Sequence, residues 1–283
     1  MSEPPFATIA EAFSRTAEKY DSFSEDHPHL ARLRGKVYAH IARWLPAGSR
    51  ILELNAGTGS DAVALAQSGY TVHATDIAHG MLERLAGKIE RLKLEDRITL
   101  QECSFTDLAG MQGCPYDALF SDLGGLNCIP DLTPVIQAIP NVLRPGGVVT
   151  WVLMPPVCLW ELGTIFTGQV RLALRRFARH GTLSHLEGLY FKVYYFTPRQ
   201  VIDWFGPNYD FLALEGLSVI TPTAESKNLA HRFPRLYGTL SWIDDRLSVR
   251  PPWWGWGDFY ILSLRYHPIG YNPIGYNPAR KTP

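Results

Sequence analysis

The stretch Ile51-Leu-Glu-Leu-Asn-Ala-Gly-Thr-Gly-Ser-Asp61 decides the fold. Its first four residues are mostly apolar and predict a short buried strand. Asn55, Gly57 and Gly59 then predict a tight turn, because glycine lets the backbone approach a ligand closely and adopts positive φ without steric cost. The apolar residues at 62–66 predict a helix. A strand, a glycine-rich turn and a helix in this order are typical of the first half of a nucleotide-binding βαβ unit.

Length and composition limit the classes of protein that fit. The chain has 283 residues and a formal net charge of zero, which suits one elaborated α/β domain. A neutral chain lacks the basic surface of a protein that mainly binds nucleic acid, so we expect no nucleic-acid partner. No run reaches the ~18 apolar residues of a membrane-spanning helix, and Met1–Pro5 has no signal-peptide pattern. The four cysteines have no metal-binding spacing, so we expect reduced thiols, no metal and a cytoplasmic protein.

Predicted strands and helices alternate along the first half of the chain. This alternation favours the α/β class, with a mostly parallel sheet and helices on both faces. The predicted strands are at 71–76, 98–103, 116–122 and 148–154, and the predicted helices are at 7–20, 28–45, 79–92 and 131–143, with a polar loop at 21–26. A strand-like segment at 192–197, a helix at 197–205, a strand at 211–221, a helix at 225–247 and a last strand at 258–265 follow later.

The alternation stops at Pro155-Pro156. We therefore divide the chain into a core with N-terminal helices at 1–154, a cap insertion at 155–196 that binds the acceptor and is not sheet-like, closing helices and strands at 197–267, and a tail at 268–283. The tail repeats Pro-Ile-Gly-Tyr-Asn, and its proline and glycine content does not support a packed core. We expect the tail to be flexible.

Several landmarks together resemble the class I S-adenosylmethionine-dependent methyltransferases. Glu53-x-Asn55-x-Gly57-x-Gly59 corresponds to the first motif of that family, Glu/Asp-x-Gly-x-Gly-x-Gly, with Asn55 in place of a glycine. Asn tolerates left-handed backbone angles, so the turn can survive this change. Phe13–Asp21 is similar to the start of the small-molecule branch that includes the ubiquinone and menaquinone biosynthesis methyltransferases. The other matching landmarks are Asp76-Ile77 with Met81, Ser104-Phe105 before Asp107, Tyr116-Asp117 and Leu143–Gly147.

The resemblance implies a Rossmann-like, doubly wound, mostly parallel seven-stranded sheet with an antiparallel last strand and a helical cap. It also implies S-adenosylmethionine as the cofactor. Asp76 would accept hydrogen bonds from the ribose hydroxyls, and a helix N-cap is its alternative role. Packing alone is the alternative for Tyr20 and Met81, and a favourable place near a helix N-terminus is the alternative for Asp61. The cofactor-binding residues expected are Tyr20, Glu53, Asn55, Gly57, Gly59, Asp61, Asp76, Ile77, Met81, Ser104, Phe105 and Ser121.

No fixed catalytic set follows from the sequence. Methyl transfer is an in-line displacement that depends mainly on alignment and desolvation, and it needs a base only when the acceptor is protonated. Half-buried polar side chains are common, so a structural role is the alternative for each candidate. The catalytic candidates are Asp122, His185 and Tyr194, and Asn127, Tyr190 and Tyr195 are further candidates near the acceptor. Trp160, Phe166 and the tryptophans at 253–256 either line an apolar acceptor pocket or pack in the core.

Arg171, Arg175 and Arg179 recur at near-helical spacing in an apolar-rich segment. They predict one basic face of a helix. Three interpretations stay open for this face: a solvated surface, contact with an acidic substrate or partner, and peripheral contact with an anionic membrane.

The sequence therefore predicts a methyltransferase that acts on a small molecule. One alternative is an NAD(P)-dependent oxidoreductase on a similar fold, because Gly57, Gly59 and Ala62 also fit the spacing G-x-G-x-x-G/A. The position of Glu53 and the later landmarks weigh against it. Another alternative is a cofactor-binding partner protein without catalysis.

Overall fold

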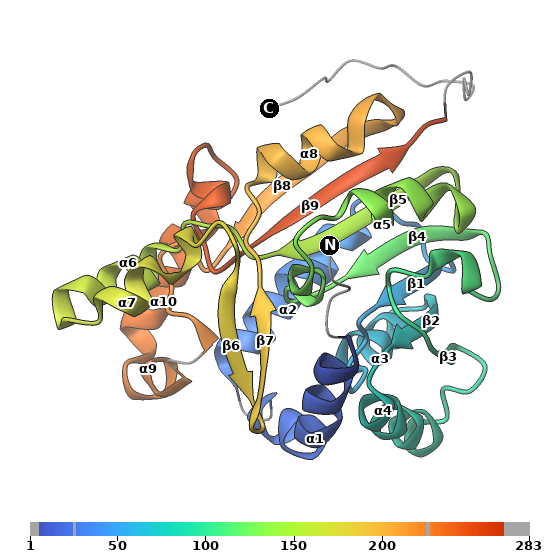
Figure 1. Cartoon of the computed structure of the whole chain (residues 1–283), viewed down its shortest axis with the longest axis horizontal. Helices are drawn as coiled ribbons and strands as arrows, with labels where there is room; N and C mark the ends of the chain where they lie inside the picture. Colours follow the sequence, from blue (N-terminus) through green and yellow to red (C-terminus); the bar gives the residue numbers. More distant parts are fainter. Residues whose placement is uncertain (1–5, 25–26, 225–226, 269–283) are drawn as a thin grey trace.

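A seven-stranded sheet forms the centre of the computed structural model, which describes residues 6–24, 27–224 and 227–268 (Figure 1). The strand order is β3-β2-β1-β4-β5-β9-β8. Strands β1 to β5 are parallel, and β9 is antiparallel to both of its neighbours, which confirms the predicted sheet. The strands are β1 (Arg50–Leu54), β2 (Thr71–Asp76), β3 (Ile98–Glu102), β4 (Tyr116–Ser121), β5 (Leu143–Leu153), β8 (Tyr209–Leu217) and β9 (Phe259–Tyr266).

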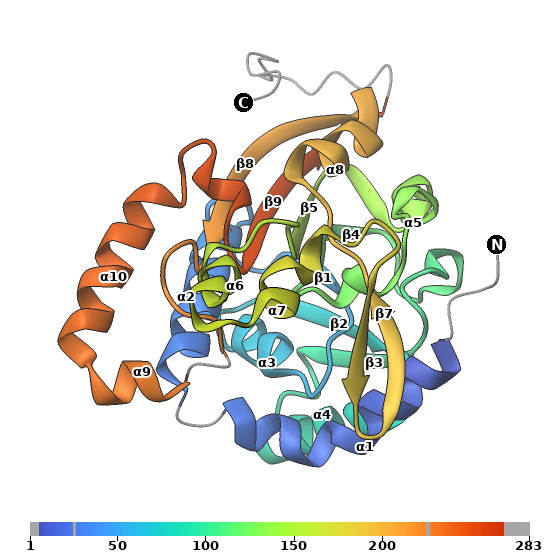
Figure 2. The same ribbon diagram turned by 60° about the vertical axis from the view of Figure 1, so that its left-hand side comes forward.

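Helices cover both faces of the sheet (Figures 1 and 2). Alternate residues of β1 show why: Ile51 packs in the apolar cluster of one face, and Leu52 and Leu54 pack in the cluster of the other. A strand that is buried on both faces has a mostly apolar sequence, as β1 has. One face carries α2 (Pro28–Ala42), α3 (Ser60–Gln67) and α4 (His79–Leu92), and the other carries α5 (Thr133–Ala138) and α8 (Pro198–Phe205).

Helix α1 (Phe6–Ser24) packs against α4 and against a separate two-stranded hairpin of β6 (Thr182–Leu186) and β7 (Leu189–Val193). Lys19 Nζ lies 3.0 Å from Glu187 Oε1 in the turn of this hairpin. Figure 1 shows α1 and the hairpin near one another at the same end of the sheet. The expected polar loop at 21–26 is wrong over residues 21–24, because α1 continues to Ser24. The expectation that 155–196 is not sheet-like is also wrong.

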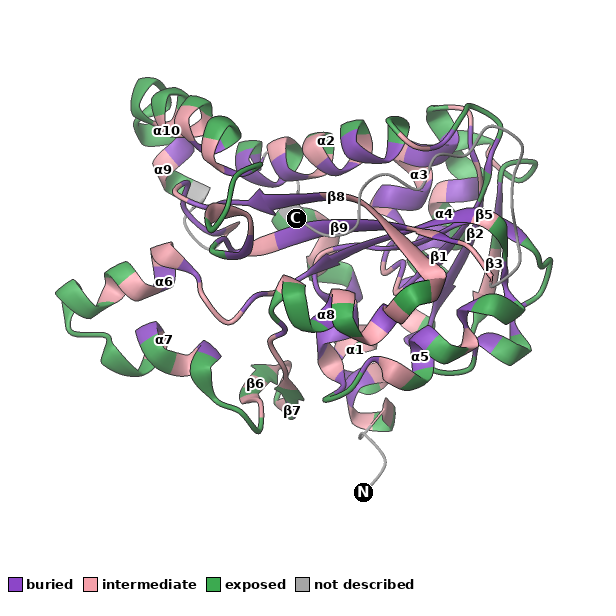
Figure 3. Cartoon of the chain, turned by 90° about the horizontal axis from the view of Figure 1, so that it is seen from above, coloured by how far each residue is buried: buried purple, intermediate pink, exposed green. Residues whose placement is uncertain are grey.

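The rest of the cap differs from the predicted basic helix. Two short helices, α6 (Leu159–Gly163) and α7 (Val170–Leu174), project from the body (Figure 3). Gly168 lies between α6 and α7. Its φ of 80° is left-handed and ends the short turn that follows α6. Arg175 turns back to Glu161, with its Nη2 2.7 Å from Oε1. The prediction of one continuous arginine face is therefore wrong, and Arg171 and Arg179 remain exposed.

Arg176 instead anchors the cap to the sheet. Its buried guanidinium lies 2.6 Å from Glu161 Oε1 and 2.5 Å from Asp258 Oδ1, at the start of β9. Cys158 lies beside these two carboxylates in a group with metal-ligand spacing. The guanidinium already pairs with both acids, so this cluster has the character of a structural ion pair.

Proline interrupts two of the predicted helices. The helix expected at 131–143 is α5 followed by a short 3-10 turn at 139–141. The helix expected at 225–247 is α9 (Lys227–Arg232) and α10 (Pro234–Leu247), because Pro234 has no N–H to continue the ladder. No helix in the described ranges has the length and apolarity to cross a bilayer. The tail from 269 to 283, predicted to be flexible, lies outside the described residues.

Candidate functional site

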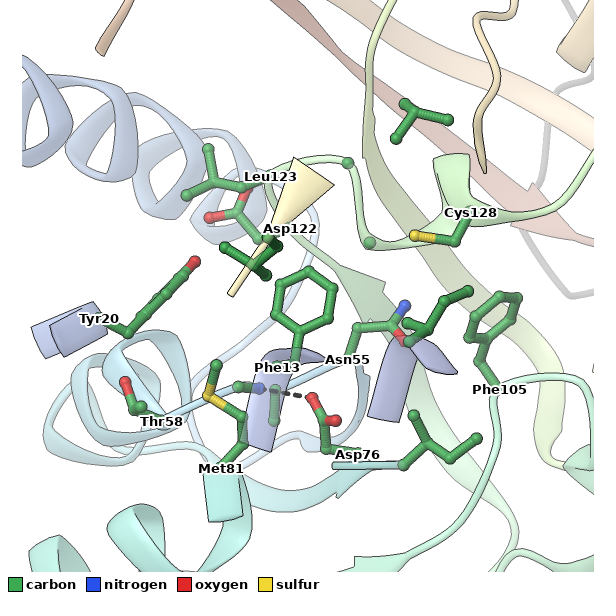
Figure 4. A pocket seen from close by; sticks show the side chains of 18 of the residues that line it. Phe13, Tyr20, Asn55, Thr58, Asp76, Met81, Phe105, Asp122, Leu123 and Cys128 are labelled. Carbon is green, nitrogen blue, oxygen red and sulfur yellow. Dashed lines mark hydrogen bonds between the residues drawn. The ribbon is translucent and has the colours of Figure 1, made fainter. Parts of the chain in front are cut away.

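A cavity of about 350 Å³ lies at the carboxyl ends of β1, β2 and β4 (Figure 4). The strand order reverses between β1 and β4, and such a switch point is where open α/β sheets bind ligands. The floor comes from the loops after the strands. The walls come from α1 and from the β6–β7 hairpin, which contribute Phe6, Ile9, Phe13, Tyr20, Ser184, His185, Leu186, Phe191 and Val193.

Asp76, at the end of β2, holds the glycine turn in place. Its Oδ2 accepts a hydrogen bond from the Gly57 N–H at 2.8 Å, and its Oδ1 accepts one from the Ala78 N–H at 2.8 Å. Ala78, rather than Asp76, is the N-cap residue of α4. Burial raises the pKa of the Asp76 carboxyl, and the backbone donors partly oppose that shift. The carboxylate thus lies at the edge of the cavity with its orientation fixed by two backbone groups.

The structure shows how Asn55 occupies a position that is glycine in the family motif. It has a φ of 57°, in the left-handed region that asparagine tolerates. Its side chain lies against Gly125 in the loop after β4, where an added Cβ would come within 2.6 Å of the Asn55 Cβ. Its Nδ2 also lies 3.4 Å from Ser121 Oγ. Asn55 therefore packs the glycine turn against the loop that follows β4.

Three acids and one guanidinium gather at the end of the cavity near Tyr20. We call Glu53, Asp61, Asp122 and Arg34 the acid cluster. Arg34 Nε lies 3.3 Å from Asp61 Oδ1, whereas among the described residues both oxygens of Asp122 and Oε2 of Glu53 lack a partner with full hydrogen-bond geometry. Burial, followed by the nearby Asp61 charge, raises the pKa of both Glu53 and Asp122. An excess of buried acceptors fits a ligand that brings positive charge.

The end of α1 is fastened to the glycine turn. Asp21 Oδ1 accepts a hydrogen bond from Thr58 Oγ1 at 2.6 Å and one from Lys88 Nζ at 2.7 Å. Lys88 Nζ also donates to the Thr58 carbonyl oxygen at 2.8 Å. We call these three residues the Asp21 latch. The latch keeps α1 over the cavity and joins it to α4.

Asn127 joins three segments at the opposite side of the site. Its Nδ2 donates to the carbonyl oxygens of Tyr194 at 2.6 Å and Met154 at 3.3 Å, and its Oδ1 accepts from the Met154 N–H at 3.0 Å. The amide is fully buried. The predicted role of Asn127 near the acceptor is therefore wrong, because its polar atoms are bonded to the backbone.

Most of the predicted site residues line the cavity, but several do not. Tyr194 and Ser121 lie outside the lining, and Ser104 bonds to Thr106 instead. Gly59 packs closely on Leu85, and Glu53 is buried on β1 without reaching the lining. The predicted residues in the lining are Tyr20, Asn55, Gly57, Asp61, Asp76, Ile77, Met81, Phe105, Asp122 and His185.

Sequence reasoning missed two parts of the lining. Phe6, Ile9 and Phe13 form the cavity face of α1; the helical stripe was recognised, but its partner was not. Arg34 also lines the cavity from α2, and because Lys36 lies in the same interval between Leu33 and Val37, the sequence gives no signal that singles out Arg34. The other lining residues that were not predicted are Ala56, Thr58, Ser60, Leu123, Gly124, Gly125, Cys128, Met154, Ser184, Leu186, Phe191 and Val193.

Known proteins show both the domain and the fold. Residues 51–147 match the family model described as a methyltransferase domain. The demethylmenaquinone methyltransferase of Clavibacter sepedonicus is 38% identical over 119 residues, which cover 41% of this chain and 46% of that protein. The tRNA 5-carboxymethoxyuridine methyltransferase of Escherichia coli K12 is 27% identical over 150 residues, covering 53% and 56%. The chain spans about half the length of these curated relatives.

A solved structure extends the likeness of fold over nearly the whole chain. The DhpI complex with S-adenosylhomocysteine has a TM-score of 0.60 at 14% identity, and the match covers 95% of this chain and 100% of that one. Residues 51–147 therefore form a methyltransferase domain, and the sheet around it has the fold of the matched structure. The comparisons do not favour the nicotinamide alternative.

Proposed function

We propose that this protein transfers a methyl group from S-adenosylmethionine to a small-molecule acceptor. The observation that carries the proposal is one continuous cavity that joins the glycine turn held by Asp76 to an apolar space under α1 and the hairpin. The matched methyltransferase domain supports the cofactor. The names of the two relatives, one acting on demethylmenaquinone and one on a tRNA nucleoside, do not choose the acceptor.

The lining suggests how the cofactor is held. We assign the ribose hydroxyls to Asp76 and the adenine to the apolar side chains of Ile77, Met81 and Phe105, which border Asp76 in the cavity. The amino-acid end then lies at the Glu53 and Asp61 side of the acid cluster, whose buried acidic groups match an ammonium group, and Asp122 faces the acceptor side. S-adenosylmethionine, when bound, supplies an electrophilic methyl group on a sulfonium sulfur. Residues 1–154 and 197–267 would form the binding core, and 155–196 the cap over the acceptor.

Asp122 is our candidate to receive the proton that the acceptor loses. It lines the cavity at the end of β4, and within the part of the chain that the structure describes neither of its oxygens has a partner with full hydrogen-bond geometry. Burial and Asp61 raise the pKa of the Asp122 carboxyl, which makes it a stronger base than an exposed aspartate. His185 is exposed on the cavity wall beside Tyr190, with ring centroids 4.6 Å apart. We assign His185 to contact with the acceptor at the entrance.

Calorimetric titration tests the cofactor assignment. We expect S-adenosylmethionine and S-adenosylhomocysteine to bind and NADH not to bind. Binding of NADH alone would overturn the proposal and return the oxidoreductase alternative. Binding of S-adenosylhomocysteine without any methylated product from a cell extract would favour the non-catalytic alternative.

Asp122→Asn tests the proton acceptor. We expect kcat to fall about 10²–10⁴-fold, the usual contribution of general base catalysis, with KM changed less than kcat. The measurement is the pair of kinetic constants with a protic acceptor, together with the affinity for S-adenosylhomocysteine. An unchanged kcat would remove Asp122 from the chemistry.

Membrane contact by the arginine segment remains a separate proposal. Arg175 and Arg176 are held by Glu161, so Arg171 and Arg179 are the cations that this segment offers to a surface. Exposed apolar side chains of the same segment, such as Phe166, support the same contact. Flotation with anionic vesicles tests it, and the absence of salt-sensitive binding would contradict it.

A further inference from the structure

The cavity has two chemically different parts. The part near the glycine turn is polar and belongs to the proposed cofactor site. The other part, which we call the outer compartment, lies between α1, the loops after β4 and β5, and the hairpin. Its apolar lining consists of Phe6, Ile9, Phe13, Leu123, Cys128, Met154, Leu186, Phe191 and Val193.

Few polar side chains reach the outer compartment. Those of Ser184 and His185 come from β6, and Asp122 lies at its inner boundary. Arg34 is the one lysine or arginine of the lining in the ranges that the structure describes, and it lies in the acid cluster 3.3 Å from Asp61. No guanidinium or ammonium among these residues is therefore left to pair with an anionic acceptor.

The charges of the surrounding site also disfavour an anionic acceptor. Asp61, Asp76 and Asp122 line the cavity, against the one charge of Arg34. A carboxylate or phosphate in the outer compartment would lose its hydration without a counter-ion and would lie near like charges, and both effects are costly in a buried site. An uncharged ligand with an apolar body avoids both costs and gains from burial against phenylalanine rings.

We propose that the acceptor is an uncharged molecule with a mainly apolar, ring-sized body and one hydroxyl or amine N–H directed at Asp122. This inference rests on the proposed function and names the acceptor class for that site. It separates this chain from enzymes whose acceptors carry a carboxylate or a phosphate. The β6–β7 hairpin determines this class of acceptor, because it contributes more lining residues to the outer compartment than any other element of the cap.

Two probes of the same shape test the charge preference. 2-Naphthol and 2-naphthoate are titrated at pH 7.5 into the protein saturated with S-adenosylhomocysteine. We expect 2-naphthol to bind at least tenfold more tightly. Equal or tighter binding of 2-naphthoate, or no binding of 2-naphthol up to its solubility limit, overturns the inference. Failure of S-adenosylhomocysteine to bind at the outset would instead overturn the proposed function.

A charge placed in the outer compartment should reverse the preference. Ser184→Lys introduces an ammonium into the lining and should raise the affinity for 2-naphthoate at least tenfold. Leu183→Lys is the matched control, because Leu183 is the preceding residue of β6, is 63% exposed and does not line the cavity. The control should leave both affinities unchanged. An equal gain in both variants would mean a non-specific charge effect and would contradict the inference.

Retained affinity for S-adenosylhomocysteine shows that each variant is folded. If Ser184→Lys loses it, His185→Lys replaces it, because His185 is exposed and lines the same wall. The same gain for 2-naphthoate is expected there. A folded His185→Lys protein without that gain overturns the inference.

Discussion

Asp76 has two tasks that a single carboxylate can perform together. It orients the glycine turn through the Gly57 N–H and faces the cavity where the ribose is assigned. Asp76→Ala should therefore weaken binding of S-adenosylhomocysteine by about 1.5–3 kcal/mol, the scale of lost hydrogen bonds to a charged group. Calorimetry measures the change. Asp107→Ala is a control, because Asp107 caps a short turn outside the cavity and should leave the affinity unchanged.

Asn55 and Gly125 form a coupled pair. Gly125→Ala alone should destabilise the protein by about 1–3 kcal/mol, because the new methyl group meets the Asn55 side chain. Asn55→Gly removes that side chain and keeps the left-handed angle, so Gly125→Ala should cost much less in the double variant. Urea unfolding of the four proteins gives the coupling free energy. Additive effects would show that Asn55 does not enforce the close approach.

At the scale of single residues, the sequence predicts the site residues that directly follow a strand or belong to a motif. Asp76, Met81 and Phe105 line the cavity because their spacing follows the parallel strands, and their contacts with a cofactor stay predictions. Arg34 and Phe191 were missed because they reach the cavity through tertiary packing of α2 and the hairpin. The backbone of Tyr194 bonds to Asn127 and its side chain lies outside the lining, so its catalytic role stays a prediction without support from the cavity.

Among the elements, α1 depends most on a few contacts. The Asp21 latch is partly buried, so Asp21→Asn should weaken it by about 1–2 kcal/mol through loss of a charged partner. Faster amide exchange at the end of α1 and a several-fold loss of S-adenosylhomocysteine affinity are expected. Glu11→Gln removes an exposed pair with Arg15 on the same helix and should change neither. Unchanged exchange in Asp21→Asn would contradict the role of the latch.

The elements of the core were predictable and those of the cap were not. β1 and α4 follow from continuous apolar runs and from a helical stripe, which local sequence determines. The cap lacks such a pattern, because Arg176 gains its burial from Glu161 and Asp258, and Asp258 is distant in the sequence. The arginine spacing therefore predicted one basic face. In the fold, Arg175 pairs with Glu161, whereas Arg171 and Arg179 are exposed.

For the whole molecule, stability should depend on pH through Glu215. Burial alone would raise the pKa of Glu215, but His40 and Lys36 lower it to about 2 from 4.5. A lowered pKa gives stability that is present above about 4.5 and is lost as the pH falls towards 2. Glu215→Gln should be less stable by roughly 2–3 kcal/mol at pH 7. Denaturant unfolding should show this difference shrinking below pH 4.5 and vanishing near pH 2.

The acid cluster should act with the opposite sign. Burial and the Asp61 charge raise the pKa of the Asp122 carboxyl in the folded protein. Asp122 therefore stabilises the folded protein at low pH, and this stabilisation is lost as the pH rises through the raised pKa. Asp122→Asn should therefore flatten the decline in stability that begins as the pH rises above about 4, the ordinary pKa of an aspartate, in the ligand-free protein. A decline as steep as in the unmodified protein would mean that Asp122 titrates normally.

The Asn127 amide has a consequence for how such a protein can diverge. Its three bonds reach only main-chain atoms of Met154 and Tyr194. The side chains at these two positions can therefore be exchanged without breaking the joint, and Met154 is part of the cavity lining. Acceptor preference can change through such replacements over evolutionary time or in a laboratory library, while the same amide keeps the neighbouring segments in register.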